Sequence, residues 1–590
     1  MTEFRVWAPA ARQVTAQVAD RRYDMAPAGG GWWQADVPSV TPDARYGFRL
    51  DGGDLLADPR SPRQPDGPAG LSQRYDQSAF SWTDAGWHGR PLPGSVLYEL
   101  HTGTFTPAGT FDAAIDRLDY LVELGIDAVE LMPAAAFPGL RGWGYDGISL
   151  WAVHEPYGGP DGLKRLVDAC HARNLAVVLD VVYNHVGIGN RLAEFGPYFT
   201  SAHVTPWGPA VNLDQPGSAE VRAFVIGNAL MWLRDYHLDG LRLDAVHELA
   251  DGSSVHLLAE LAEAVAGLAS ELGRELILIA ESDASDPLLS TPRDAGGYGL
   301  TAQWNDDFHH ALHAVLTGER QGYYRDFGSL AALAKTLTRV FLHDGGWSTF
   351  RGTTLARPVD VSSTPAYRFV GYLQDHDQVG NRAVGDRIGA SLSDGLLRVG
   401  AGLLLTAPFT PMLFMGEEWG ASTPWQYFTD HQDPWLGRGA ANGRRADLVR
   451  QGWTGEVPDP QDAATFARSR LDWAELGTEP HSSLLGWYAE LIGLRRRLPE
   501  LTDPRLDDVA VTFDEEQQWL VVNRGGVSDR AVGIAANISP MAQRVPSGIA
   551  GGRLAAASEA GITIKDTAAW LPPASLAVIV GAAVAEQARV

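Results

Sequence analysis

The chain has 590 residues, which is too long for one ordinary hydrophobic core and predicts about two to four domains. Its 47 basic and 72 acidic residues give a formal charge of −25, and this charge disfavours binding to nucleic acid and to anionic lipid surfaces. No apolar run approaches the roughly 18 residues of a membrane span. We therefore expect no nucleic-acid or membrane partner. The single cysteine, Cys170, fits a reducing cytoplasm.

Short alternating segments follow the N-terminus and are separated by glycine-containing turns. They are Phe4–Ala8, Val14–Val18, Trp32–Val37 and Tyr46–Leu50. This spacing predicts a small β-sandwich, which a proline-rich stretch at residues 58–68 joins to the rest of the chain. We place this first domain at residues 1–92. Trp32 and Trp33 could bind glucan there, but core packing is favoured.

Eight nearly continuous apolar segments come next, with helix-like stretches between most of them. They are Val96–Leu100, Ala128–Met132, Ala176–Val182, Leu238–Leu243, Leu276–Ala280, Leu300–Trp304, Tyr367–Leu373 and Pro411–Met415. Continuous apolar strands are typical of parallel sheets that are buried on both faces. Eight of them with intervening helices predict a closed (β/α)8 barrel rather than an open sheet. The fold class is therefore α/β.

The pattern changes again after the eighth segment. We expect a polar loop over Thr429–Arg450 and a last barrel helix over Leu484–Arg497. Beyond Thr502 the chain has short β-type runs separated by turns, at Val509–Phe513, Trp519–Asn523, Ala531–Ile538 and Leu576–Val580. These runs predict a second β-sandwich. The predicted division is a barrel domain at residues 93–502 and a C-terminal sandwich at residues 503–590.

Carboxylates follow four of the barrel strands. If the strands are parallel, Asp180, Asp244, Glu281 and Asp377 lie at their carboxyl ends and converge on one face, where barrel active sites lie. Each has a structural explanation by itself, since Asp180 could bind Arg242 and Glu281 could cap a helix. Four acidic side chains crowded together repel one another, however, which favours a functional explanation for the set.

Carboxylates combined with many aromatic residues suggest cleavage of a glycosidic bond. That reaction needs one carboxylate as nucleophile and one carboxylic acid as proton donor, and aromatic rings, here 19 Trp and 17 Tyr, can pack on sugars. The chain has no His-Glu-x-x-His, paired-cysteine or Asp-x-Asp-x-Asp-Gly pattern. We therefore expect neither a catalytic metal nor another cofactor, and calcium held by scattered carbonyls stays an alternative.

Four segments together resemble the α-amylase superfamily. They are Asp180-Val-Val-Tyr-Asn-His185, Gly240-Leu-Arg-Leu-Asp244, Ala280-Glu281 and His376-Asp377, in the order and on the strands that the superfamily uses. The resemblance implies that Asp244 is the nucleophile, Glu281 the general acid/base and Asp377 the transition-state stabiliser. It also implies that Arg242 orients Asp244, and that His185 and His376 bind the sugar.

Longer segments resemble one family within that superfamily, the maltooligosyltrehalose trehalohydrolases. They are Tyr98–Pro107, Trp143–Gly147, Trp304–His310, Asp377–Arg382, Met415–Trp419 and Gln426–His431. The resemblance covers essentially the whole chain. It implies hydrolysis, with retention, of the α-1,4 bond that joins trehalose to a maltooligosaccharide, so that maltooligosyltrehalose and related α-1,4-glucans are the expected partners. A functional pairing with the synthase that makes this substrate is also implied.

Several further residues are expected to bind substrate. His247-Glu248 stands where many amylases have Lys-His, on the leaving-group side where trehalose would lie. Polar groups after Asp377 would fix a particular disaccharide by hydrogen bonds, and an aromatic ring would stack on the sugar at the cleavage point. The remaining candidates are Tyr145, Glu319, Tyr323, Gln378, Asn381 and Arg382.

One departure from the family pattern is Asp375, where the family usually has Asn before His-Asp. An extra carboxylate beside Asp377 would raise a neighbouring pKa, unless an arginine pairs with it. Two alternatives to the trehalohydrolase interpretation stay open. One is a glycogen branching or debranching enzyme, and the other is a non-catalytic glucan-binding protein on an amylase scaffold.

Overall fold

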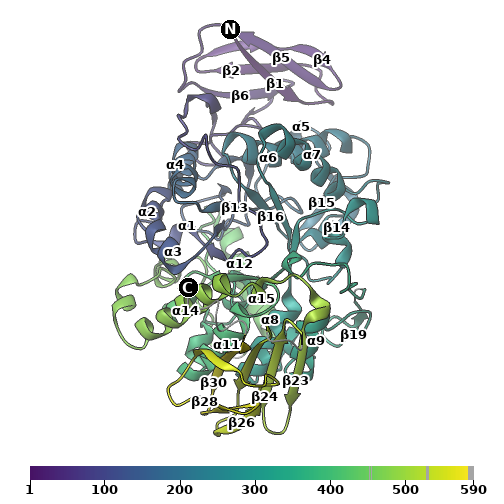
Figure 1. Cartoon of the computed structure of the whole chain (residues 1–590). Helices are drawn as coiled ribbons and strands as arrows, with labels where there is room; N and C mark the ends of the chain where they lie inside the picture. The colour runs from purple at the N-terminus through teal and green to yellow at the C-terminus, as the bar shows by residue number, and fades with distance from the viewer. Residues whose placement is uncertain (356, 451, 454, 527–529, 583–590) are drawn as a thin grey trace.

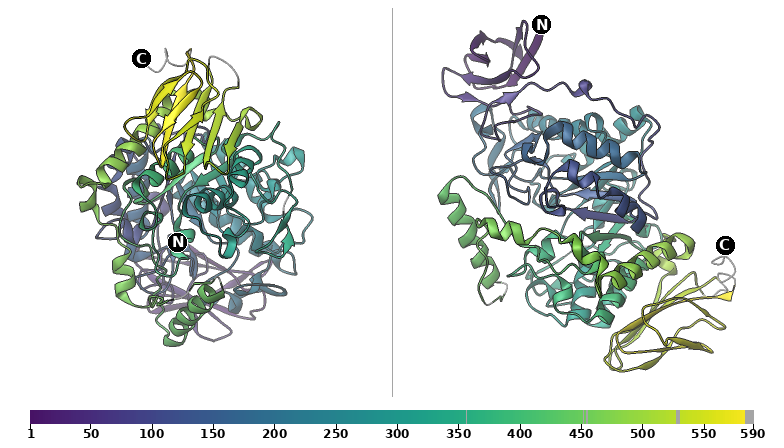
Figure 2. Two further views of the ribbon diagram at one scale, coloured as in Figure 1. Left: turned by 90° about the horizontal axis from the view of Figure 1, so that it is seen from below. Right: turned by 90° about the vertical axis from the view of Figure 1, so that its left-hand side faces the viewer.

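The structure is a computed structural model that describes residues 1–355, 357–450, 452–453, 455–526 and 530–582. A central barrel separates two β-modules, one formed by each end of the chain (Figure 1). Turned views place these modules at opposite ends of the molecule (Figure 2). The predicted fold class, a (β/α)8 barrel with a sandwich on either side, is confirmed.

The barrel consists of eight parallel strands that are buried along their whole length. They are β9 (Leu97–Leu100), β10 (Ala128–Leu131), β13 (Ala176–Val181), β16 (Gly240–Leu243), β17 (Ile277–Ala280), β18 (Ala302–Trp304), β21 (Phe369–Tyr372) and β22 (Thr410–Phe414). Burial on both faces explains why most positions of these strands are apolar. Strand β22 pairs with β9 and closes the barrel.

Helices cover the outside of the barrel, as the apolar spacing between the strands indicates. The longer ones are α4 (Gly159–His171), α6 (Ser218–Asp235), α7 (Leu257–Leu272), α8 (Asp306–Thr317), α9 (Leu330–Arg339), α11 (Asp394–Leu405) and α14 (His481–Arg497). Cys170 is fully buried in α4. Among the helices of the described part of the chain, none has the length and apolar character needed to cross a bilayer.

The N-terminal module contains two sheets. One is formed by β1 (Thr2–Trp7), β5 (Trp32–Val37) and β4 (Ala26–Gly29), and the other is built around β3 (Arg21–Asp24), β2 (Val14–Val18), β6 (Arg45–Leu50) and β7 (Leu55–Leu56). Trp33 donates from Nε1 to the Ala8 carbonyl, and Trp32 packs beneath Arg5 and Arg60. Both tryptophans therefore contribute to packing, which agrees with the favoured prediction.

The C-terminal module is also a two-sheet structure. Its larger sheet has the order β23 (Ala510–Asp514), β24 (Trp519–Arg524), β25 (Val532–Asn537), β30 (Ser575–Val580) and β27 (Arg553–Ala557). The smaller one is β26 (Gln543–Pro546), β29 (Ala568–Leu571) and β28 (Thr563–Lys565). Sequence reasoning found β23, β24, β25 and β30. It missed the other four, which are shorter or contain Pro and Ala, residues that are uncommon in strands.

One predicted loop was wrong. Most of Thr429–Arg450 forms a helix, α12 (Pro434–Arg450). Its three glycines lower helix propensity, and its buried positions are few, so the periodic apolar pattern that indicates a helix is weak. Tertiary contacts supply what propensity lacks, because Leu448 is buried and Arg444 bonds to the segment that follows β21.

Candidate active site

A cavity of about 520 Å³ opens at the carboxyl ends of the barrel strands. Its wall contains acidic, histidine and aromatic side chains. Eight of the predicted site residues line it: Tyr145, His185, Asp244, His247, Glu281, His376, Asp377 and Asn381. Residues that lie more than 200 positions apart in the sequence, such as Tyr145 and His376 (231 apart), therefore meet in one place.

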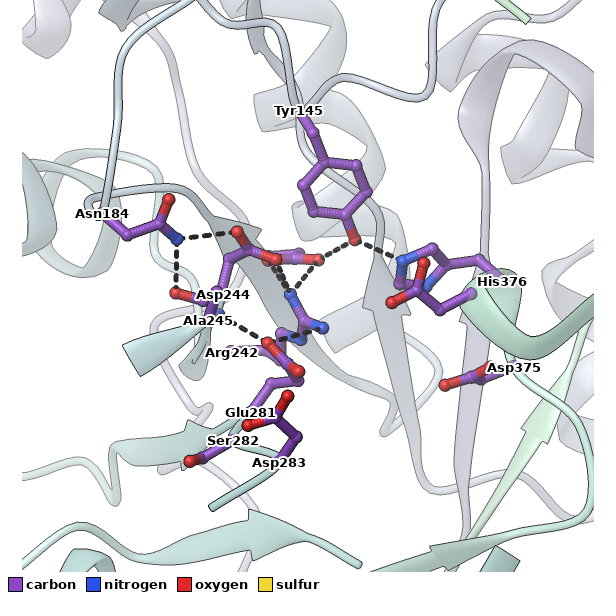
Figure 3. A network of polar contacts seen from close by, with 12 residues as sticks. Tyr145, Asn184, Arg242, Asp244, Ala245, Glu281, Ser282, Asp283, Asp375 and His376 are labelled. Carbon is purple, nitrogen blue, oxygen red and sulfur yellow. Dashed lines mark hydrogen bonds and ion pairs between the residues drawn. The ribbon is translucent and has the colours of Figure 1, made fainter. Parts of the chain in front are cut away.

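Arg242 is the cation that holds the carboxylates together (Figure 3). Its side chain, on β16, is only 1% exposed. Nη1 donates to Asp180 Oδ2 at 2.9 Å and to Asp244 Oδ1 at 2.8 Å, and Nη2 lies 3.7 Å from Glu281 Oε2. Three carboxylates thus share one buried positive charge, which offsets part of the repulsion among them.

Asp244 is held at both of its carboxylate oxygens. Arg242 binds Oδ1, and Asn184 donates from Nδ2 to Oδ2 at 2.8 Å and to the Asp244 carbonyl at 2.7 Å. Hydrogen bonds and a cation both favour the ionised form of a carboxylate and fix its orientation. Asn184 lies inside the predicted Asp180–His185 segment, but its side chain was not singled out as part of the site.

Glu281 has a different environment. Its Oε2 accepts a hydrogen bond of 2.5 Å from the Ala245 amide. Burial raises the pKa of Glu281 well above its usual range; Arg242 opposes this rise, and the charge of Asp244 adds to it. The raised pKa favours the protonated form of Glu281, which is the form that a proton donor needs.

Tyr145 and His376 connect Asp180 to a second buried carboxylate, Glu99. The Tyr145 hydroxyl donates to Asp180 Oδ2 at 2.5 Å and lies 2.9 Å from His376 Nε2. On the other side of the ring, Nδ1 of His376 is 2.5 Å from Glu99 Oε1. Burial opposes the charged form of His376, but Glu99 outweighs it and raises the pKa to about 10. His376 therefore has an N–H at both ring nitrogens.

Asp377 is the second residue of the short helix α10 (His376–Gly380) and lines the cavity. Asn381 donates from Nδ2 to Asp377 Oδ1 at 2.8 Å. Arg444 of α12 lines the same cavity and bonds to Asn381. Sequence reasoning missed Arg444, because its segment was predicted to be a loop.

Asp375 caps this helix and is fully buried. Its Oδ1 accepts a hydrogen bond of 2.8 Å from the backbone N–H of Gln378, which is the bond that an N-cap residue makes. Asn and Asp are about equally good caps, so the exchange of the usual Asn for Asp keeps the helix start. Burial raises the pKa of Asp375 well above its ordinary value, and Glu99 adds to this rise. This environment favours the protonated form of the extra carboxyl group.

Five predicted substrate-binding residues and Arg242 are not part of the cavity wall. The five are Glu248, Glu319, Tyr323, Gln378 and Arg382. Both terminal nitrogens of Arg382 donate to Glu319 at 2.9 Å, and Glu319 also bonds to His313. This network supports the segment behind Asp377. The side-chain amide of Gln378 faces the Asp375 carboxyl group, and the Tyr323 ring stacks on His310.

The cavity also contains aromatic residues that sequence reasoning did not select. Trp207, 49% exposed, follows β14 (Phe199–Thr205) in the turn before β15 (Gly208–Val211) and stacks on His185 with ring centroids 4.3 Å apart. Trp143 and Tyr427 pack together in another part of the wall. An exposed tryptophan in a turn has no periodic pattern, so its position relative to the cavity was not predictable. Across the described residues, no cluster of three His, Cys, Asp or Glu side chains is arranged to hold a metal ion.

The chain resembles known proteins along nearly its whole length. Residues 82–195 match the family model described as "Alpha amylase, catalytic domain", and residues 1–61 match "Carbohydrate-binding module 48 (Isoamylase N-terminal domain)". The malto-oligosyltrehalose trehalohydrolase of Mycobacterium tuberculosis is 51% identical over 585 residues, covering 98% of this chain and 99% of the relative. That of Arthrobacter ramosus is 58% identical over 528 residues, covering 88% and 91%. The chain belongs to the malto-oligosyltrehalose trehalohydrolase family.

Solved structures share this fold over nearly the whole chain. A Salmonella typhimurium protein provisionally named an α-amylase has a TM-score of 0.89 and 36% identity, with 98% of this chain and 97% of that chain covered. A pullulanase from Anoxybacillus sp. LM18-11 has a TM-score of 0.72 at 16% identity, covering 98% and 84%, and shows only that the fold is shared. The resemblance to the trehalohydrolases is therefore confirmed, and this chain is a glycoside hydrolase.

Proposed function

We propose that the protein hydrolyses the α-1,4 bond between trehalose and the maltooligosyl chain of maltooligosyltrehalose, with retention, and releases trehalose. Family membership supports this substrate. The observation that carries the chemistry is the contrast between two carboxyl groups at one cation: donors hold Asp244 at both oxygens, whereas the surroundings of Glu281 raise its pKa. A nucleophile and a proton donor need these two different environments.

The reaction proceeds in two steps. Asp244 attacks the anomeric carbon while Glu281 gives its proton to the glycosidic oxygen, so the carbon–oxygen bond breaks and trehalose leaves. A covalent glycosyl–enzyme remains, and Glu281 is now a carboxylate. Glu281 then takes a proton from water, which attacks the same carbon and frees Asp244. Two inversions give net retention, for which the two carboxyl groups should stand roughly 5–5.5 Å apart.

The remaining groups stabilise charge and position the sugar. Asp377 stabilises the positive charge that develops on the ring, and His376 donates to the sugar from Nε2, since Glu99 holds Nδ1. His185 binds the same sugar, while the Tyr145 ring packs against it. On the leaving-group side, His247 is a direct trehalose contact, and Glu248 lies beside it. Four residues contribute indirectly, by holding the segment that carries Asp377. They are Glu319, Tyr323, Gln378 and Arg382.

Three wider proposals accompany this function. The domain division is residues 1–92, 93–502 and 503–590. A synthase that converts the reducing end of an α-1,4-glucan into a trehalose unit supplies the substrate, so the two enzymes are paired in function. The single buried thiol of Cys170 supports a cytoplasmic location.

Product analysis tests the function directly. Purified protein is incubated with maltotriosyltrehalose and, separately, with maltopentaose, and the products are identified by chromatography. We expect trehalose and maltotriose from the first substrate and much slower cleavage of the second. Equal cleavage of both would instead indicate a general α-1,4-glucanase.

The alternatives make different products. A branching enzyme from Xanthomonas campestris is 32% identical over 393 residues but covers only 58% of this chain. Branched or debranched glucan without free trehalose would favour that class. Binding of glucan with no cleavage of any substrate would favour a non-catalytic protein, which has no need for the set Asp244, Glu281 and Asp377.

A further inference from the structure

The guanidinium of Arg444 reaches from α12 to the end of α10. Nη1 donates to Asn381 Oδ1 at 2.5 Å, and Nη2 donates to the Arg382 carbonyl at 3.2 Å and to the carbonyl of Gly380. The side chain also packs over the Tyr427 ring, with 5.5 Å between the guanidinium carbon and the ring centroid. One side chain thus fixes three consecutive residues just after Asp377.

The direction of these bonds has a chemical consequence. An arginine side chain has only donors, so the atom of Asn381 that faces it must be the acceptor Oδ1. The amide nitrogen then points the other way and donates to Asp377 Oδ1 at 2.8 Å. Without Arg444, only the bond to Asp377 would orient the Asn381 amide, so the side chain and the carboxylate that it holds would be less firmly fixed.

We propose that Arg444 is a positioning residue for the reaction, which acts through the Asn381 amide to hold the Asp377 carboxylate in place. The hydrogen bond occupies Oδ1 and leaves Oδ2 to face the sugar. Arg444 does this from a helix that belongs to none of the four superfamily segments. The inference rests on the proposed function, because Asp377 is assigned there as the transition-state stabiliser.

The test compares single and double variants on maltotriosyltrehalose. Arg444→Met and Asn381→Ala should each lower kcat by about 10- to 100-fold, since small misplacements of a catalytic group cost about that much. KM should change by less than about threefold, because the interaction is needed mainly in the transition state. If Arg444 acts through Asn381, the double variant should be no slower than Asn381→Ala alone.

Further variants separate positioning from a structural role. Asn381→Asp keeps an acceptor for Arg444 but has no N–H for Asp377, so it should lose activity while its thermal unfolding stays close to wild type. Arg444→Lys should recover part of the lost kcat. The control is Arg445→Met, because Arg445 is the next residue on α12 and its side chain is exposed.

The outcomes are distinguishable. Wild-type release of trehalose establishes the proposed function in the same assay, and the variants then test the inference alone. Three results would overturn the role of Arg444. They are losses of kcat that multiply in the double variant, a wild-type rate for Asn381→Asp, and a change confined to KM. If Arg444→Met does not fold, Asn381→Asp and Arg444→Lys decide the question.

Discussion

Asp244 and Glu281 share a cation but differ in the groups that hold them. Two donors hold the Asp244 carboxylate, from Arg242 and Asn184. Glu281 is partly buried, and desolvation raises its pKa despite Arg242. The same two residue types would be interchangeable in water, where their pKa values differ by only about 0.4. The contrast between them is therefore a property of their positions, and it supports the proposal that Asp244 attacks and Glu281 donates the proton.

Loss of either carboxyl group should abolish turnover by different routes. Asp244→Asn and Glu281→Gln should each lower kcat on maltotriosyltrehalose by more than about 10⁴-fold, as removal of a covalent or proton-transfer group does. Circular dichroism and thermal unfolding should remain close to wild type for the Gln variant, which keeps the shape of the side chain.

A substrate with an activated leaving group separates the two roles. A dinitrophenyl α-glucoside needs no protonation on departure, so Glu281→Gln should still form the covalent intermediate and show a burst of phenolate. Asp244→Asn should show no burst. A burst from Asp244→Asn and none from Glu281→Gln would reverse the assignment.

The alkaline limb of the activity profile should respond to Asp306. Glu281 must be protonated to act as the acid, so kcat/KM falls as the pH rises through its pKa. The charge of Asp306 raises that pKa, and Asp306 itself, with a pKa raised by burial to about 7, is ionised above that pH. Asp306→Asn should therefore move the alkaline limb to lower pH, by about one unit or less.

The control for this profile is Asp294→Asn, because Asp294 is an exposed acidic residue. The alkaline limb of the kcat/KM profile of Asp294→Asn should coincide with that of the wild type. A limb that moves to higher pH in Asp306→Asn, or does not move, would contradict the assignment of Glu281 as the titrating acid.

The catalytic candidates within the four superfamily segments were predictable from the sequence. The residues that hold them in place by hydrogen bonds were less predictable. Asp244, Glu281 and Asp377 follow apolar strands, which gives them a pattern that sequence alone reveals. Glu99 and Asn184 lie in segments that were recognised, yet their roles depend on contacts with strands elsewhere in the barrel. Arg444 had no such pattern, because only tertiary contacts bring it to the cavity.

At the scale of elements, α10 has almost no free space at its end. A Cβ on Gly380 would lie 2.1 Å from two ring atoms of Trp143 and 3.1 Å from Trp425. Trp143 lines the cavity and is fixed by a bond from Nε1 to the Gln426 carbonyl. The glycine therefore sets the position of a cavity wall as well as the packing behind it.

Gly380→Ala should consequently impair both stability and activity. Overpacking of this kind costs about 1–3 kcal/mol in the free energy of unfolding. The displaced Trp143 ring should also lower kcat/KM by about 10-fold or more. Urea unfolding and steady-state kinetics on maltotriosyltrehalose measure the two effects.

A second glycine serves as the matched control. Gly267 lies in the middle of α7 with open space around its missing Cβ. Gly267→Ala should stabilise the protein by up to about 1 kcal/mol, as alanine does in an exposed helix, with activity unchanged. Equal behaviour of the two variants would show that contact with Trp143 is unimportant.

The barrel strands were predictable as elements because each is a short, buried and mainly apolar run. Even β18, with three residues, fell inside the predicted segment Leu300–Trp304. Helix α12 was not predictable, since Gly437, Gly439 and Gly443 weaken its local preference. Its stability depends on contacts with residues 380–382, which are distant in the sequence.

At the scale of the whole molecule, Arg60 joins the N-terminal module to the barrel domain. Its guanidinium lies over Trp32 of the module at 5.4 Å and over Trp151 and Phe224 of the barrel domain at 5.0 and 5.4 Å. Burial lowers the pKa of Arg60, although it remains charged. One cation between three rings thus connects two units of the fold.

Arg60→Ala should loosen this connection. A desolvated cation–π contact contributes about 2 kcal/mol, so the apparent melting temperature should fall and proteolysis between the module and the barrel should accelerate. Activity at low temperature should stay near wild type, because Arg60 lies outside the cavity. Arg12→Ala is the control, since that side chain is 91% exposed and its loss should change stability by no more than about 0.5 kcal/mol.

Closure of the barrel sets a condition on how the enzyme is made. Strand β9 begins at Leu97, and one of its edges pairs with β22, which begins only at Thr410. That edge stays unpaired until β22 has been synthesised. At about 5–20 residues per second, roughly 15 to 60 s of translation separate the two. Throughout that time the nascent chain carries an apolar, unpaired strand edge on the ribosome, which is the kind of surface that chaperones bind. The last carboxylate of the active site emerges before the barrel can close, so activity begins only after β22 is released.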